Sequence, residues 1–156
     1  MVKRAALLLL GLLGIMVLRV EVVEAVRVSS DSMSPTLHRG DIVVVYKSGR
    51  AAQPGDLVTF SSPVDGSRNL KRIVGAPGDV VDIRDAVLHR DGRRIDEPYV
   101  DQASSDALYY GPVAVPPGFY LVLGDKRAGS VDSREYGPVP ADSITGRVVG
   151  TIWPLR

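Results

Sequence analysis

The sequence predicts a mostly β protein: a compact antiparallel β-barrel-like domain preceded by one N-terminal transmembrane helix. From residue 26 onward, short apolar runs rich in Val, Ile and Tyr are cut by Gly and Pro, and almost none has helical periodicity. Before that point lies one uncharged, Leu-rich stretch, residues 5–18. A chain of 156 residues has room for one modest core. We therefore expect residues 1–23 to form a cytoplasmic N-terminus with a signal-anchor helix, and residues 24–156 to form an extracytoplasmic β-rich domain.

The N-terminal stretch has the charge pattern of a membrane-insertion signal. Lys3 and Arg4 precede it, whereas the cations that follow it are offset by nearby Glu residues. Fourteen helical residues span about 21 Å, and continuing to Val23, with Arg19 reaching toward the interface, brings the helix near the roughly 30 Å of the hydrocarbon core. The positive-inside rule then predicts a single span with its N-terminus in the cytoplasm. The expected location is the plasma membrane.

Two other interpretations of this stretch stay open. Fourteen apolar residues are also a normal length for the core of a secretory signal peptide, and Val23-Glu24-Ala25 offers a small-residue cleavage site. Cleavage there would release a soluble protein. The stretch could also be a buried core helix, although a Leu-rich helix without a polar stripe is unusual on a protein surface.

Eight strands are expected in the β-rich part. They are residues 26–29, 42–46, 57–60, 70–74, 80–83, 87–89, 118–123 and 147–152. An Asp91-Gly92 pair predicts a type I′ hairpin. Four Gly-Asp pairs predict turns, because Gly adopts positive φ and Asp can bind local amides. Residues 96–117, rich in Pro and Tyr, are expected to form a long excursion from the barrel.

The composition argues against several classes of function. The net charge is only +1 and no basic run could follow a phosphate backbone, so we expect no nucleic-acid partner. The absence of Cys excludes a thiol nucleophile, a thiolate metal site and a disulfide. His38 and His89 share no metal-ligand spacing, and we expect neither a metal nor a cofactor.

Ser32 is a candidate nucleophile, and the chain offers three candidate bases for it. A serine hydroxyl reacts poorly until a neighbouring base takes its proton. His38 or His89 could serve in principle, but no G-x-S-x-G elbow surrounds Ser32. Lys71 is the third candidate.

Lys71 lies in one of the expected strands. Alternation along that strand places Lys71 with Ile73 on one face, toward an apolar side or a cleft, and leaves Arg72 for water. Judged by its local sequence alone, Lys71 would be a solvated strand residue. To act as a base near neutral pH, its pKa of about 10.4 must fall by about three units, equivalent to roughly 4 kcal/mol, and burial can supply that shift.

Three ordered blocks of sequence surround these candidates. Residues 30–37 read SDSMSPTL, residues 71–79 read KRIVGAPGD, and residues 124–137 read GDKRAGSVDSREYG. They resemble the S-x-M-x-P-T-L box, the K-R-x-x-G-x-P-G-D box, and the G-D-N-R and S-x-D-S-R signature of the type I signal peptidases. The blocks occur in that family's order, and the resemblance covers the chain from about residue 26 to residue 153.

The resemblance implies a membrane-anchored serine endopeptidase that works by a Ser-Lys dyad and removes N-terminal signal peptides from exported preproteins. It implies Ser32 as the nucleophile, Lys71 as the general base and Ser130 as the residue that orients the lysine amine. The backbone amide of Ser32 and the hydroxyl of Ser30 would stabilise the oxyanion. The residues expected to give structural support through ion pairs are Asp125, Asp132 and Arg134.

The resemblance also implies the substrate and the partners. A preprotein would lie extended beside a strand edge and be cut after small residues, at an Ala-x-Ala type site. Residues 26–30 and 69–73 are expected to line this groove. The expected partners are preprotein signal peptides, the phospholipid membrane and the secretion machinery.

Three features depart from the family pattern. Asn69 stands where the family usually has Tyr, so one wall of the groove differs. Lys126 replaces the Asn of G-D-N-R; we expect it to face solvent, although a cation there could also lower the pKa of Lys71. Only about 45 residues separate the second and third blocks, so the chain looks like a minimal form of the enzyme.

Two alternative functions are weighed against this one. A self-cleaving Ser-Lys repressor would share the dyad, but that family often carries a DNA-binding helix-turn-helix where this chain has its apolar stretch. A catalytically inactive, membrane-tethered β module acting as a binding subunit would not need all four of Ser30, Ser32, Lys71 and Ser130. A penicillin-binding enzyme is excluded because the chain contains no S-x-x-K.

Overall fold

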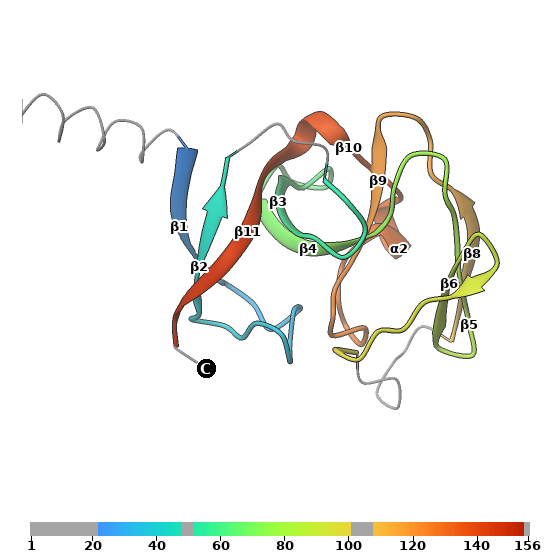
Figure 1. Ribbon diagram of the computed structural model, residues 1–156, viewed down its shortest axis with the longest axis horizontal. Helices are drawn as coiled ribbons and strands as arrows, with labels where there is room; N and C mark the ends of the chain where they lie inside the picture. Colours follow the sequence, from blue (N-terminus) through green and yellow to red (C-terminus); the bar gives the residue numbers. More distant parts are fainter. Residues whose placement is uncertain (1–21, 48–51, 101–107, 155–156) are drawn as a thin grey trace, which may run out of the picture.

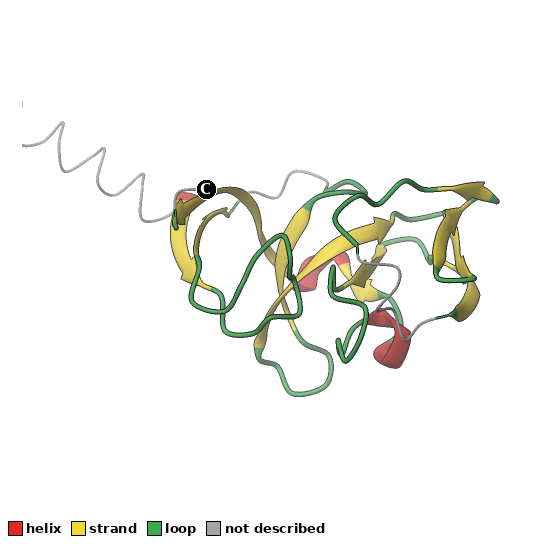
Figure 2. Cartoon of the chain, turned by 90° about the horizontal axis from the view of Figure 1, so that it is seen from below, coloured by secondary structure: helices red, strands yellow, loops and turns green. Residues whose placement is uncertain are grey.

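The computed structural model describes residues 22–47, 52–100 and 108–154, and their regular structure is mostly β (Figure 2). The strands are β1 (Val23–Arg27), β2 (Ile42–Tyr46), β3 (Leu57–Ser61), β4 (Arg68–Gly75), β5 (Val80–Arg84), β6 (Val87–Arg90), β7 (Arg93–Arg94), β8 (Tyr109–Ala114), β9 (Phe119–Leu123), β10 (Val139–Pro140) and β11 (Ile144–Trp153). Two short helical elements, α2 (Ser133–Tyr136) and η2 (Ala141–Ser143), lie between β9 and β11.

The strands form two antiparallel sheets. The larger has seven strands in the order β1-β2-β11-β3-β4-β9-β10, and the smaller has four in the order β7-β6-β5-β8. In Figure 1 the larger sheet curls from β1 at the left through β3 and β4 to β9, and the smaller sheet lies at the right. The mostly β, antiparallel class expected from the sequence is confirmed, with the strands divided between two sheets.

Two clusters of buried apolar side chains form the core of the larger sheet. One packs β2 against the segment that joins β1 to β2, and the other packs β3, β4, β9 and β10 together. The first contains Val28, Met33, Leu37, Val43 and Val45, and the second contains Val58, Phe60, Ile73, Tyr120, Val122 and Val139. Because Met33 and Leu37 belong to the first cluster, the segment after β1 is anchored to the sheet through buried side chains.

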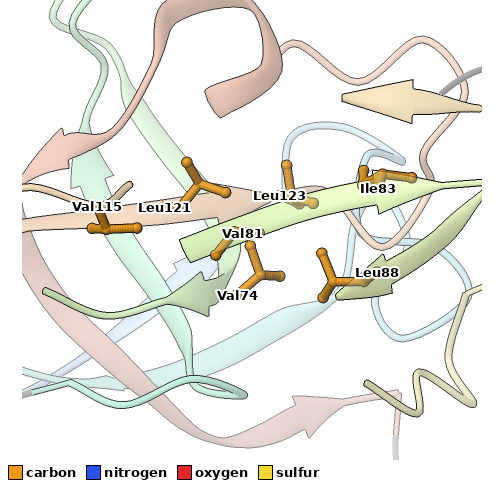
Figure 3. Close-up of a cluster of buried hydrophobic side chains, with 7 residues drawn as sticks. All are labelled: Val74, Val81, Ile83, Leu88, Val115, Leu121 and Leu123. Carbon is orange, nitrogen blue, oxygen red and sulfur yellow. The ribbon is translucent and has the colours of Figure 1, made fainter. Parts of the chain in front are cut away.

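A third apolar cluster joins the two sheets. Figure 3 shows side chains from β4 and β9 of the larger sheet packed against side chains from β5 and β6 of the smaller one. Its buried members are Val74, Val81, Ile83, Leu88, Val115, Leu121 and Leu123. The smaller sheet is therefore docked on the strand that carries Lys71.

All eight expected strands are present, although their ends differ by up to three residues. The Asp91-Gly92 hairpin is confirmed: both residues have positive φ, 52° and 73°, as a type I′ turn requires. The expected excursion over residues 96–117 needs correction. It contains β8, which pairs with β5 and forms one edge of the smaller sheet.

The expected signal-anchor stretch, residues 5–18, lies outside the described residues. In the part of the chain that is described, no helix has both the length and the apolarity needed to cross a bilayer. Val23, to which the expected helix was extended, is the first residue of β1.

Candidate active site

Ser32 lies in a turn within the segment that joins β1 to β2. The Ser34 amide donates to the Asp31 carbonyl (3.0 Å), and the Leu37 amide donates to the Met33 carbonyl (2.9 Å). Met33, directly after Ser32, is only 1% exposed, whereas Ser32 itself is half-buried. The buried Met33 side chain thus fixes the turn, while the Ser32 hydroxyl stays accessible.

Lys71 reaches this hydroxyl from β4. Its Nζ atom lies 2.7 Å from Ser32 Oγ, at hydrogen-bonding distance. Ser30 Oγ lies 3.2 Å from the same oxygen. The two residues proposed from the sequence as nucleophile and base are therefore in contact, although 39 positions separate them in the chain.

The environment of Lys71 favours its neutral form. The residue is only 4% exposed, and burial is the main cause that lowers its pKa below the usual 10.5. The charge of Arg134 lowers the pKa further, whereas Asp132 and Asp125 act in the opposite direction. Since burial outweighs the two carboxylates, the net shift is downward.

Gly124 brings the third block against the turn that holds Ser32. A Cβ atom at position 124 would lie 2.7 Å from the Ser32 carbonyl oxygen and 2.2 Å from Ser130 Oγ, so only glycine fits here. Two residues further on, the Lys126 amide donates to the Ser32 carbonyl (3.1 Å). The block therefore packs on the main chain of the serine, and no side chain is tolerated at the contact.

Ser130 lies in the same contact, but its expected hydrogen bond to Lys71 is not formed. The residue is 5% exposed, and Ser130 Oγ has no hydrogen-bond partner among the described residues. The Lys71 amine is instead directed at Ser32. A buried hydroxyl without a partner is costly.

The ion pairs expected around the site are present, with one correction. Asp125 accepts two hydrogen bonds from Arg72, from Nε (2.8 Å) and Nη2 (2.6 Å), and one from the Thr36 hydroxyl (2.5 Å). Arg72 therefore does not face water, as alternation had predicted: its side chain is 11% exposed, and its guanidinium lies 3.8 Å from the centre of the Tyr99 ring. The three blocks meet at Asp125, because Thr36 and Arg72 come from the first two.

Asp132 organises the end of the third block. It accepts from Arg134 Nε (2.8 Å) and from the Gly124 amide (3.0 Å). Arg134 in turn donates to the main-chain carbonyls of Arg127 (2.7 Å) and Ser130 (3.2 Å). This pair thereby holds the loop from Gly124 to Ser130 in shape.

Two cavities meet at Ser32. The first, of about 240 Å³, is lined by residues 26–30 and 68–70 together with Ser32, Met33 and Thr59. The second, of about 340 Å³, lies beside Lys71 and is walled by Asp31 and by residues of the third block. Ser30, Ser32 and Asn69 line both, so the cavities are neighbouring parts of one cleft with Ser32 between them.

Neither histidine lines this cleft. His38 Nε2 lies 3.3 Å from the Ser34 hydroxyl, and His89 Nδ1 lies 3.0 Å from the Val87 carbonyl on the smaller sheet. Among the described residues, no three His, Cys, Asp or Glu side chains are grouped so that they could hold a metal ion. The arrangement at Ser32 is thus a hydroxyl, a buried amine and a cleft, which suits acyl transfer.

Comparison with known proteins agrees with this geometry. A family model described as "Signal peptidase, peptidase S26" matches residues 1–153. The chain belongs to this family. The resemblance noted in the sequence is thereby confirmed.

Individual signal peptidases cover most of the chain. A probable signal peptidase I-2 of Synechocystis sp. is 39% identical over 148 residues, which are 88% of this chain and 66% of that relative. Signal peptidase I of Bacillus licheniformis is 33% identical over 153 residues, 90% of this chain and 82% of the relative. The crystal structure of a signal peptidase I from Enterococcus faecalis V583 is 34% identical and aligns with a TM-score of 0.56, covering 63% of this chain and 97% of that one.

Sequence reasoning missed a buried ion pair behind the signal peptidase blocks. Arg127 Nη2 lies 2.5 Å from Glu97 Oε1, with exposed side-chain fractions of 2% and 1%. The Tyr99 hydroxyl also donates to this carboxylate (3.2 Å). Arg127 could have been noticed as part of the third block, but nothing in the local sequence singles out Glu97 or Tyr99.

Proposed function

We propose that the chain is a membrane-anchored serine endopeptidase that cleaves N-terminal signal peptides from exported preproteins, after small residues of an Ala-x-Ala type site. The observation that carries this proposal is the 2.7 Å contact between Lys71 Nζ and Ser32 Oγ, made by a lysine that is almost fully buried. The names of the relatives, which include several signal peptidases I, support the same activity.

The first half of the reaction is acyl transfer to Ser32. Neutral Lys71 accepts the hydroxyl proton while Ser32 Oγ attacks the carbonyl carbon of the scissile bond. The new C–O bond places negative charge on the carbonyl oxygen. When the adduct collapses, the C–N bond breaks and the Lys71 ammonium returns its proton to the leaving amine, which becomes the N-terminus of the mature protein. The signal peptide remains as an ester on Ser32.

The second half is hydrolysis of that ester. Lys71, neutral again, takes a proton from a water molecule that attacks the ester carbonyl. Collapse of this second adduct breaks the C–O bond to Ser32, and the proton on Lys71 returns to Ser32 Oγ. Both halves require an amine that is neutral at the start, and burial favours that state because it lowers the pKa of Lys71.

The oxyanion would be stabilised by two donors near the nucleophile. The Ser30 hydroxyl is well placed for this, since its oxygen lies 3.2 Å from Ser32 Oγ. The backbone amide of Ser32 would be the second donor. Losing one such donor typically costs about 10²–10³-fold in kcat, so Ser30→Ala is expected to be slow but measurably active.

The first cavity suits the residues before the cut. Residues 26–30 form one wall and residues 68–70 form the other, so an extended segment between them could bond to main chain on either side. The cavity is small, which is consistent with small side chains next to the scissile bond. Asn69 lies on the wall at the junction with the second cavity.

Membrane attachment belongs to the same proposal. The N-terminal charge pattern supports a span within residues 1–23, a cytoplasmic N-terminus and an extracytoplasmic catalytic domain. Ile152 and Trp153, which are 47% and 63% exposed, add an apolar surface at one end of β11. Trp153 pairs with Ile42, which also pairs with Arg27 next to the first cavity. Apolar exposure close to the cleft is consistent with an enzyme that works against a lipid surface.

The proposal is tested with the full chain in detergent and a preprotein that bears an Ala-x-Ala site. We expect cleavage directly after the second Ala, identified by mass spectrometry of both products. Ser32→Ala and Lys71→Ala should remain folded and lose about 10³-fold or more in kcat/KM.

Matched controls separate chemistry from folding. Ser34→Ala alters the same turn at a hydroxyl that contacts His38, and Lys47→Ala removes a surface lysine that pairs with Glu24. Both should retain most of the activity. If a folded Ser32→Ala or Lys71→Ala variant turned over substrate at a rate comparable with the parent, the dyad would be refuted; a parent that binds but never cuts would favour the inactive binding module.

A further inference from the structure

The second cavity is placed to receive the residues after the cut. It meets the first cavity at Ser30, Ser32 and Asn69, with the reactive hydroxyl between the two. An extended chain whose signal-peptide residues occupy the first cavity must continue past Ser32 Oγ. The first residues of the mature protein therefore enter the second cavity.

Lys126 is fixed on the wall of this cavity. Its backbone amide donates to the Ser32 carbonyl (3.1 Å), so its main chain is tied to the main chain of the nucleophile. Its side chain is exposed and lines the second cavity together with Ser32 and Lys71. Its ammonium makes no ion pair within residues 22–47, 52–100 and 108–154.

Two other titratable groups line the same cavity. Asp31 directly precedes Ser32 in the sequence, and its carboxylate Oδ1 accepts a hydrogen bond from the Arg39 amide (2.9 Å). Lys71 is buried, and its amine is already in contact with Ser32 Oγ at 2.7 Å. Among the described residues that line this cavity, Lys126 is therefore the cation whose side chain can meet a substrate side chain.

We propose that Lys126 selects preproteins with an acidic side chain at the first or second position of the mature sequence. This inference rests on the proposed function, because it concerns the substrate of the same site. An exposed ammonium and a carboxylate attract each other weakly across water, by up to about 1 kcal/mol, which corresponds to about fivefold in kcat/KM. The attraction should weaken as salt screens it.

The apolar neighbours of Lys126 are consistent with this role. Val131, which is 51% exposed, and Ala128 line the cavity beside it. They can contact the methylene groups of a Glu or Asp side chain while its carboxylate turns to the ammonium. A basic substrate residue would instead place two cations in one cavity, which is unfavourable.

The test uses three preproteins that differ only in their first two mature residues, which are Asp-Asp, Asn-Asn or Lys-Lys. The readout is the ratio of kcat/KM for the Asp substrate to that for the Lys substrate, measured with the full chain at about 50 mM and about 500 mM salt. We expect a ratio of about five to ten at low salt that falls toward one at high salt, with the Asn substrate in between.

Two variants test the residue itself. Lys126→Asn should bring the low-salt ratio near one, and Lys126→Glu should invert it. Lys47→Asn, which changes the net charge equally but at a distant surface pair with Glu24, should leave the ratio as in the parent.

The outcomes separate this inference from the function on which it rests. Equal cleavage of the three substrates by the parent, or a preference that survives in both Lys126 variants, would overturn the role of Lys126 and leave the peptidase in place. Failure of the parent to cleave any of the three would overturn both.

Discussion

Lys71 is a buried amine whose nearest polar neighbour is a neutral hydroxyl. An ammonium in that position is poorly solvated, and the carboxylates of Asp125 and Asp132 are engaged by Arg72 and Arg134. Both carboxylates are thus paired with arginines, and neither forms an ion pair with Lys71. The same arrangement that lowers the pKa of Lys71 should lower the stability of the fold, because the unfolded chain can protonate this amine freely.

The first prediction follows from that difference. Lys71→Met should be more stable than the parent at neutral pH, because burial lowers the folded-state pKa of Lys71 below 10.5 and the folded chain therefore holds this proton less tightly than the unfolded chain. The stability of the parent should therefore rise with pH between the lowered pKa and 10.5, and the advantage of Lys71→Met should shrink over the same window. Chemical denaturation of both proteins at several pH values measures the difference in their free energies of unfolding.

A surface control belongs to this experiment. Lys47→Met, at a residue whose side chain is 37% exposed, should change stability little at any pH. If Lys71→Met were the less stable protein at every pH, the buried amine would be making favourable interactions as an ammonium, contrary to this account.

The second prediction concerns Gly124. An added methyl group would meet the Ser32 carbonyl and Ser130 at distances that real contacts do not show, so Gly124→Ala must shift the serine turn. We expect destabilisation by about 1–3 kcal/mol and a loss of about 10²-fold in kcat from misplacement of the nucleophile. Thermal unfolding and preprotein cleavage measure the two effects.

Gly150→Ala is the matched control, because a Cβ atom there would meet nothing within 4 Å. It should be as active and as stable as the parent. Parent-like turnover in Gly124→Ala would show that the third block does not set the position of Ser32.

At the residue scale, the sequence indicated that Ser32 and Lys71 form a pair, which the structure places in contact, but it misplaced the neighbouring Arg72. Alternation correctly puts Lys71 and Ile73 on the same face, and both are buried. It also puts Arg72 on the opposite face, but it cannot say what covers that face. Tyr99 and Asp125, from distant parts of the chain, cover it, and no local pattern records such long-range contacts.

At the scale of elements, the connection after β7 is tied to the third block by Glu97 and Arg127. Their side chains are almost fully buried, so removal of one partner leaves an uncompensated charge. The third prediction is that Glu97→Leu destabilises the fold by about 3–5 kcal/mol. A double replacement by Glu97→Leu and Arg127→Met should recover much of this loss. Urea unfolding measures all three proteins.

A surface pair gives the comparison. Arg147 and Asp56 lie 3.5 Å apart, with side chains that are 43% and 23% exposed, so Arg147→Met should cost at most about 1 kcal/mol. Equal effects of Glu97→Leu and Arg147→Met would mean that the Glu97 connection does not hold the third block.

In the smaller sheet, sequence patterns predicted one hairpin turn but missed another turn and one strand. Asp91-Gly92 was recognisable because Gly accepts positive φ readily. The hairpin between β5 and β6 turns instead at Asp85 and Ala86, whose φ values of 51° and 63° are unusual for these residues. Strand β8 was missed because Gly111-Pro112 interrupts it, and Pro is tolerated there since β8 is an edge strand.

At the scale of the whole molecule, the proposed catalytic centre lies where three distant segments meet on the larger sheet. The turn after β1, strand β4 and the loop after β9 each supply one block. Asp125, in the third block, accepts hydrogen bonds from Thr36 in the first block and Arg72 in the second. The family blocks made this assembly predictable, whereas the division into two sheets was not, because strand order depends on contacts between residues far apart in sequence.

The fourth prediction concerns the membrane. If residues 1–23 include a retained span, the full chain expressed in cells should stay in the membrane fraction after carbonate extraction, and its β-rich domain should be open to protease from the outer side only. N-terminal sequencing checks retention directly. A mature N-terminus near Ala25 in a soluble fraction would instead establish cleavage of the segment.

The central claim is that Lys71 is a neutral amine when it meets Ser32. Titration of the full chain in detergent, with ¹³C-labelled lysine Cε followed by NMR and Lys71→Arg used for assignment, measures this amine directly. The account predicts a Lys71 pKa well below 10.5 that coincides with the pH at which kcat/KM for preprotein cleavage rises. A Lys71 pKa at or above 10.5 in an active enzyme would contradict it.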